Sequence, residues 1–173
     1  MGAKFLVLTS NPGNRIDKRE INQSLKMIND ALGDKIILIA GKMHAAGVMG
    51  ESSENIMTIS DVDEFVKNGA DIILMPAPGT VPGVTLEVTR SLVCHAHKLG
   101  VMTMTSIGTS QEGSDTETIR QIAIMAKMAG TDLHHIGDSG YIGIAIPENI
   151  FTYGVAIRGK RHTYSRISRS VNR

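Results

Sequence analysis

One stretch decides the fold of this chain: residues 132–143 read DLHHIGDSGYIG. The stretch begins as a short apolar strand and turns into a loop with three glycines, and Pro147 then marks the start of a helix. A strand, a glycine loop and a helix N-terminus together turn backbone N–H groups toward a bound anion. His134, His135 and Asp138 come at the end of the strand, where parallel α/β sheets and barrels keep their sites. The stretch therefore predicts a parallel α/β fold with a ligand site at this edge.

The same succession of strand, polar loop and helix occurs four more times upstream. The expected strands cover residues 5–9, 36–40, 72–75 and 101–106. The helical patterns that follow them end in glycine, at Gly33, Gly69, Gly100 and Gly130. Five βα units of about 30 to 36 residues result, a spacing typical of parallel α/β proteins.

Two architectures fit five such units. A flavodoxin-like open sheet needs five strands and about this length, whereas a complete (βα)8 barrel needs about 250 residues. Every expected strand ends in a polar or glycine-rich segment, and the first strand already carries such a loop, which favours barrel units. We therefore expect residues 1–173 to form a single α/β domain made of five units of a TIM barrel, an incomplete barrel. The open sheet is the alternative, because five barrel strands leave two exposed edges.

Composition narrows the functional class. The 173 residues are 42% hydrophobic and 20% charged with a net charge of +1, so a dedicated nucleic-acid binder is not expected. The single cysteine, Cys94, fits a reducing compartment, and the short apolar runs and the strand close to Met1 predict neither a membrane span nor a signal peptide. We therefore expect a cytoplasmic protein. A basic end is expected to pack on the barrel or on a neighbouring subunit, and it contains Arg158, Lys160, Arg161, Arg166, Arg169 and Arg173.

Four residues are candidates for acid–base chemistry. Lys42 and His44 are two positions apart at the end of a strand and share a face, so both would stand at the barrel mouth if that face points inward. Lys42 could then form a Schiff base or bind an anion, and His44 could move protons. His134 and His135 face opposite ways, and we favour His135 for the barrel side. Glu112 is the best carboxylate candidate for a general base.

An anion site is expected at the last two loops, where barrels often bind phosphate. Glycines permit close backbone approach to the ligand, and hydroxyls supply hydrogen bonds. The expected ligand residues are Gly108, Thr109, Ser110, Gly137, Asp138, Ser139 and Gly140. The cofactor is unknown. A divalent metal held by His44, His135 and Asp138 is the less favoured alternative, because no carboxylate-rich set accompanies them.

Four motifs carry a family resemblance: IAGKMH at 39–44, ILMPAPGTVPG at 73–83, TSIGTSQEG at 105–113 and AIRGKRHTY at 156–164. They resemble an uncharacterised bacterial TIM-barrel family, often labelled haloacid dehalogenase-like hydrolase or phosphoenolpyruvate phosphonomutase-like. The resemblance covers essentially the whole chain. It implies that the chain is the C-terminal five-eighths of a TIM barrel and that full-length relatives carry roughly three more βα units before it. The first loop departs from the pattern, since relatives are glycine-rich where this chain has residues 14–16.

Two functions are carried forward. The first is a metabolic enzyme, or enzyme fragment, that acts on a small phosphorylated or carboxylated metabolite in a hydrolase, lyase or isomerase step. The alternative is a non-catalytic truncated barrel that binds a ligand or oligomerises through its open edges. A homo-oligomer is expected in either case, with neither a membrane nor a nucleic acid as partner.

Overall fold

A computed structural model describes residues 2–10, 16–43, 53–108, 111–137 and 145–169 of the chain. In these residues five strands alternate with five α-helices, as the sequence predicts. The strands are β1 (Phe5–Ser10), β2 (Ile37–Lys42), β3 (Ile72–Pro76), β4 (Met102–Ile107) and β5 (Leu133–Ile136). The helices are α1 (Lys18–Leu32), α2 (Ile59–Lys67), α3 (Leu86–Lys98), α4 (Thr116–Ala129) and α5 (Pro147–Ile167). Short 3-10 turns are η2 (Gly33–Lys35), η4 (Ser53–Ile56) and η5 (Gln111–Gly113).

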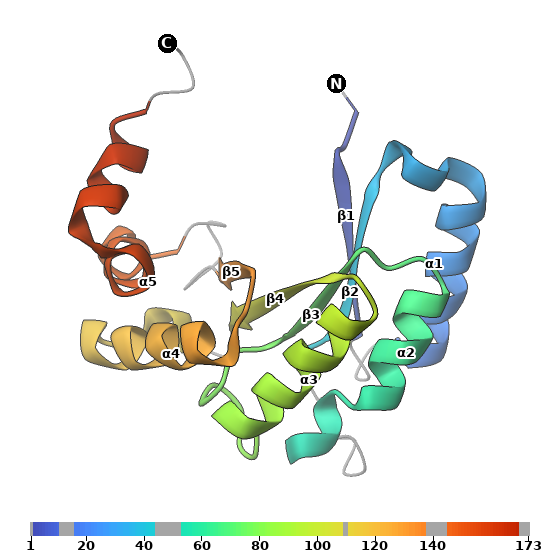
Figure 1. Cartoon of the computed structure of the whole chain (residues 1–173), viewed down its shortest axis with the longest axis horizontal. Helices are drawn as coiled ribbons and strands as arrows, with labels where there is room; N and C mark the ends of the chain where they lie inside the picture. Colours follow the sequence, from blue (N-terminus) through green and yellow to red (C-terminus); the bar gives the residue numbers. More distant parts are fainter. Residues whose placement is uncertain (1, 11–15, 44–52, 109–110, 138–144, 170–173) are drawn as a thin grey trace.

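The five strands form one parallel sheet in the order β1-β2-β3-β4-β5. This order confirms the prediction of consecutive barrel units, because a flavodoxin-like sheet would place β2 at an edge and reverse direction at a switch point. Figure 1 shows the helices following one side of the curved sheet. The opposite side we call the concave face. The arrangement is that of five adjacent units of a TIM barrel, with β1 and β5 as the two edges.

Side chains of each strand alternate between the helices and the concave face. On the helix side, Leu38 and Ala40 of β2 join Phe65 of α2 in the main buried cluster. On the concave side, Ile39 of β2 packs with Leu74 of β3 in a smaller cluster. Both faces of the central strands are thus apolar, one packed under the helices and the other turned to the concave side.

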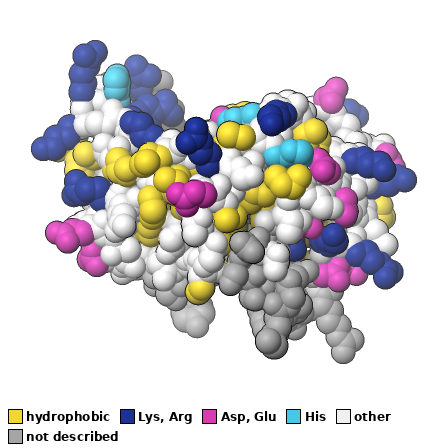
Figure 2. Space-filling view, turned by 60° about the horizontal axis from the view of Figure 1, so that its bottom comes forward, with side chains coloured by type: hydrophobic (Ala, Val, Ile, Leu, Met, Phe, Trp, Pro, Cys, Tyr) yellow, Lys and Arg dark blue, Asp and Glu magenta, His cyan; other side chains and the backbone are white. Residues whose placement is uncertain are grey.

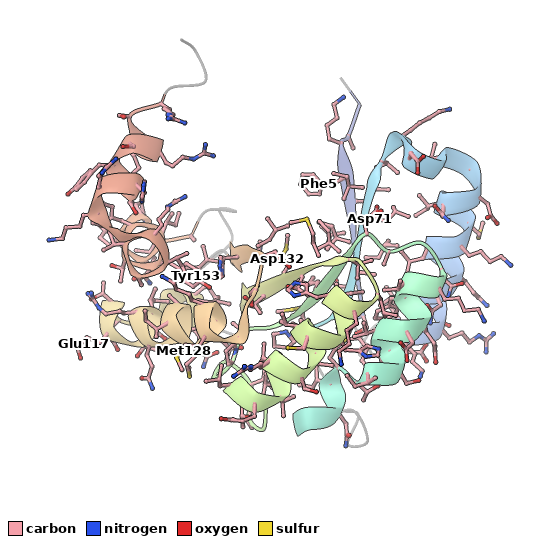
Figure 3. All side chains as sticks on the ribbon, viewed as in Figure 1. Phe5, Asp71, Glu117, Met128, Asp132 and Tyr153 are labelled. Atoms are coloured by element: carbon pink, nitrogen blue, oxygen red, sulfur yellow. The ribbon has the colours of Figure 1, made fainter. Side chains whose placement is uncertain are left out.

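The concave face keeps exposed apolar side chains toward the edges and the amino ends of the strands. Phe5 is 57% exposed and Val7 46% on β1, Ile37 is 47% exposed on β2 and Met102 46% on β4. Phe5 points from β1 toward this open side (Figure 3). A closed barrel would bury such residues in its interior layers.

Helix starts follow the capping signals in the sequence. Asp17 caps α1 in a box with Glu20, and Thr58 caps α2 in a box with Asp61, both as expected from their spacing. At α4, Ser114 with Glu117 three residues later predicts a cap at Ser114, and this prediction is wrong. Asp115 is the N-cap there, because its carboxylate accepts from the backbone N–H groups of residues 117 and 118.

Two aspartates clamp neighbouring strands at their amino ends. Asp71, just before β3, accepts the backbone N–H of Leu38 at 2.8 Å. Asp132, just before β5, accepts the N–H of Thr103 at 2.8 Å and its hydroxyl at 2.7 Å. Both lie where a helix turns into a strand (Figure 3). We call these two contacts the aspartate clamps.

Helix α5 bends at Gly159, whose φ of 78° interrupts the helical backbone. Beyond the bend, Lys and Arg side chains gather on the surface over the end of α5 (Figure 2). The apolar side chains of this end, Tyr164 and Ile167, would anchor it if they were buried, but they are 58% and 64% exposed. No helix in the described part of the chain has the length and apolar character needed to cross a membrane.

Candidate functional site

A cavity of about 350 Å³ opens on the concave face at the carboxyl ends of the strands. We call it the concave pocket. Each strand or the residue after it contributes one or more side chains, among them Thr9, Met43, Leu74, Ser106 and His135. The pocket therefore lies where parallel sheets and barrels carry their ligand sites.

His135 lies on β5 with its side chain in the concave pocket, the side favoured from the sequence. Its register partner on β4 is Ser106, so the two side chains project from the same face of adjacent strands. Nδ1 of His135 lies 2.7 Å from Oγ of Ser106, a hydrogen bond at the pocket floor. In the described part of the chain, no other group bonds the ring of His135.

Glu112, on the short turn η5, borders the same pocket. Its Oε2 atom is buried and has no hydrogen-bond partner within the described segments. A buried carboxylate oxygen without a donor is costly and calls for an explanation such as a ligand or a water molecule. Glu112 and His135 line the same pocket, so one bound ligand could contact both.

Gly108 and Gly137 bring two loops together at the pocket rim. Gly137 donates its N–H to the carbonyl of Ile107 at 2.8 Å. A Cβ added at Gly137 would lie 3.1 Å from that carbonyl oxygen and 3.9 Å from Cα of Gly108, so a larger residue would press on the neighbouring loop. The two glycines let backbone come near the pocket, as an anion site requires.

The expectation for Lys42 is wrong in one respect: Lys42 does not stand at the barrel mouth. It has the parity of Leu38 and Ala40, so it projects toward the helices. Lys42 is 2% exposed, and its Nζ lies 3.4 Å from Oδ2 of Asp61. Lys18 adds a second contact to Asp61 at 3.4 Å. In this arrangement Lys42 neutralises a buried carboxylate and does not reach the concave pocket.

Asp61 is stabilised as an anion by this cluster. Burial alone would raise the pKa of its carboxyl. Hydrogen bonds from Thr58 and the charges of Lys42 and Lys18 outweigh burial, so the pKa lies below its ordinary value. Asp61 therefore stays ionised inside the protein and links β2 to the start of α2.

His134 faces the helices, opposite to His135. Its Nδ1 lies 3.0 Å from the hydroxyl of Tyr153 on α5, and the two rings are tilted at a centroid distance of 5.4 Å. Tyr153 lies beside β5 (Figure 3). Burial raises the pKa of Tyr153 to about 12 and lowers the pKa of His134. Both groups are therefore neutral at ordinary pH, and the pair joins α5 to the sheet.

Six of the predicted site residues fall outside the described residues: His44, Thr109, Ser110, Asp138, Ser139 and Gly140. No group of three or more metal-ligating side chains occurs in the residues that the structure describes. His95 and His97 on α3 each pair with an aspartate, Asp63 at 2.6 Å and Asp132 at 2.8 Å. They lie away from the pocket, as expected for a surface pair.

The structure adds Ser106 and Thr9 to the pocket, which the sequence did not single out as ligand or catalytic residues. Ser106 lies at the end of β4, opposite His135 on the next strand, and this pairing would have identified it. The pairing depends on the register of the two strands, however, and a single sequence does not reveal the register. No pattern in the sequence marks Thr9 as a pocket residue.

The comparisons with known proteins concern the whole chain. The profile of a family described as a domain of unknown function (DUF7916) matches residues 1–173. No curated protein matches the sequence. Neither the family match nor the structures compared below support the haloacid dehalogenase-like and phosphonomutase-like labels.

Solved aldolases are similar in fold. A tetrameric deoxyribose phosphate aldolase from Aeropyrum pernix superposes with a TM-score of 0.55 at 10% identity, over 90% of this chain and 71% of that one. The YdjI aldolase from Escherichia coli K12 superposes with a TM-score of 0.56 at 9% identity, over 90% of this chain and 53% of that one. At these identities the similarity concerns the fold, and this chain spans 53% to 71% of their lengths.

Proposed function

The chain belongs to the DUF7916 family, and we propose that its concave pocket binds a small phosphorylated or carboxylated metabolite. The observation that carries this proposal is the grouping of His135, Ser106 and Glu112 in one cavity at the carboxyl ends of the strands. Barrels and open parallel sheets bind their ligands at this edge.

The anion would sit against the loops that follow β4 and β5. Gly108 and Gly137 line the pocket there, and the loops continue into the predicted ligand residues Thr109, Ser110, Asp138, Ser139 and Gly140. Backbone N–H groups of such loops would hold phosphate or carboxylate oxygens. The similarity to the Aeropyrum pernix aldolase, whose name includes deoxyribose phosphate, supports this choice of ligand class.

His135 and Glu112 are the proposed acid–base groups of a lyase, isomerase or hydrolase step. Both border the pocket, and each can exchange a proton with a bound ligand. His44, which lies outside the described residues, stays a proposed acid–base residue. Lys42 is left out of this set because its ammonium faces Asp61 and lies under the helices.

A ligand-binding protein without catalysis is the second candidate. It is supported by the concave pocket itself, whose polar groups and glycines could hold an anion without any proton transfer. Such a protein would use the same pocket and the same loops. It would bind the anion without changing it.

Binding and turnover are tested separately. Isothermal titration with inorganic phosphate, acetate and glycerol 3-phosphate should show binding that His135→Ala weakens about ten-fold, the loss expected for one charge-assisted hydrogen bond. The matched control is His95→Ala, which removes a surface histidine of α3 and should leave binding unchanged. Heat signals absent for all three anions would overturn the anion site.

Turnover is followed by ³¹P NMR on a panel of sugar phosphates. A hydrolase releases inorganic phosphate, whereas a lyase or isomerase changes the ester signals without releasing it. Loss of this turnover in both His135→Ala and Glu112→Gln supports the enzyme. Tight binding with unchanged spectra over the whole panel supports the non-catalytic candidate.

A further inference from the structure

Ser106 and His135 form the best-defined polar pair of the concave pocket. They are register partners, and Oγ lies 2.7 Å from Nδ1. Ser106 is 4% exposed, whereas His135 is exposed. The hydrogen bond therefore ties one ring nitrogen to the pocket floor and leaves the other, Nε2, without a partner in the described part of the chain.

The direction of this hydrogen bond follows from the surroundings of the serine. The only partner of its hydroxyl among the described residues is Nδ1 of His135. If Nδ1 carried the ring hydrogen, the serine O–H would lack an acceptor in a nearly buried place, which is unfavourable. If the serine donates, only the lone pairs of its oxygen lack a donor, and this costs less free energy than an O–H without an acceptor. The serine is therefore the donor, and the hydrogen of the neutral ring resides on Nε2.

We propose that Ser106 is a positioning residue that holds neutral His135 in the tautomer with its hydrogen on Nε2, so that the imidazole donates to an oxygen of the bound anion. This deepens the function proposed above and rests on it. His135 becomes the donor of the pocket, and Glu112 remains the group that can accept a proton. In this binding role the histidine transfers no proton; proton exchange with the ligand belongs to the turnover proposed above.

A built-in reference lies one residue away on the same strand. His134 has its Nδ1 3.0 Å from the hydroxyl of Tyr153, outside the concave pocket and on the opposite face of β5. Each histidine thus has its own hydroxyl partner. A change at one hydroxyl should alter only its own ring, which separates a local hydrogen-bond effect from a general loosening of the strand.

The test is ¹⁵N NMR of the imidazole nitrogens in the full chain. The spectra are recorded at a pH above which the imidazole ¹⁵N shifts no longer change, so that the tautomers of the neutral rings are compared. Wild-type His135 should carry its hydrogen on Nε2. Ser106→Ala should move the tautomer ratio of His135 roughly five-fold toward Nδ1–H, as expected when one ordinary hydrogen bond is lost. Ser106→Thr keeps the hydroxyl and should keep the ratio, and Tyr153→Phe should change His134 alone.

A predominant Nδ1–H form in the wild type, or a ratio that Ser106→Ala leaves unchanged, would overturn the role of Ser106. Inorganic phosphate is then added to the wild type. A shift of the Nε2 resonance of His135, with that of His134 unmoved, supports donation to the anion. An unmoved Nε2 resonance alongside the expected tautomer overturns the anion site itself while the tautomer assignment stands, so the two failures are distinguishable.

Discussion

The side of the sheet on which a single side chain lies determines whether it can reach the concave pocket, and Lys42 is the clearest case. It looked like a site residue because it follows a strand and precedes a histidine. Its parity with Leu38 and Ala40 puts it under the helices, beside Asp61. Because β2 is apolar on both faces, alternation alone does not reveal which face is which. The ion pair joins residues 19 positions apart, a contact that local patterns do not predict.

Lys42→Met is expected to destabilise the protein by about 2–4 kcal/mol. The change keeps the length of the side chain but leaves Asp61 buried with Lys18 as its remaining cation. Urea unfolding measures the loss. The double variant Lys42→Met with Asp61→Leu should recover part of it, because no unpaired charge stays inside. Phosphate binding should not change, and a large loss of binding in a stable variant would return Lys42 to the site.

Asp61 also predicts an acid limit to stability. The folded pKa of its carboxyl lies below the ordinary value of 3.8. A group with a lowered folded pKa stabilises the protein fully above its unfolded pKa, and the contribution is lost as pH falls through the folded pKa. The unfolding free energy should therefore decline below about pH 4, and more steeply in the wild type than in Asp61→Asn. Equal slopes would contradict the assignment.

At the scale of elements, the strand and helix pattern was predictable and the fine contacts between elements were not. Apolar runs and glycine stops locate all five units, because each signal is local. The cap of α4 was misplaced by one residue, since Ser114 and Asp115 are both good caps and only the backbone conformation distinguishes them. Asp71 before β3 and Asp132 before β5 occupy the same place in their units, but their role as clamps depends on the neighbouring strand, which the sequence does not show.

The aspartate clamps should contribute unequally to stability. Asp132 accepts from the N–H and hydroxyl of Thr103 and lies 2.8 Å from Nε2 of His97, whereas Asp71 accepts from the N–H of Leu38. Asp132→Ala should cost about 1–3 kcal/mol and Asp71→Ala less, because fewer donors are left unsatisfied. Chemical denaturation gives both values. Faster hydrogen exchange at Thr103 in Asp132→Ala alone would confirm the local cause, and equal losses would contradict it.

At the scale of the molecule, the open concave face and the two sheet edges predict self-association. Phe5 is 57% exposed on that face. Apolar surface next to the edge strand of a sheet promotes contact between copies. Sedimentation equilibrium over a range of concentrations should show association that Phe5→Lys weakens. Met27 of α1 is 72% exposed on a helix, so Met27→Lys is the matched control and should have little effect. A wild type that stays monomeric throughout would contradict the prediction.

The order of the sheet has a consequence for how the chain acquires its structure. Strands that are neighbours in space are also neighbours in sequence, from β1 to β5. No strand pairing reaches beyond the next unit, so each unit can form on the one before it as the polypeptide leaves the ribosome. The architecture grows in one dimension, as in repeat proteins, so a unit can be gained or lost at either edge while the remaining strands keep their partners.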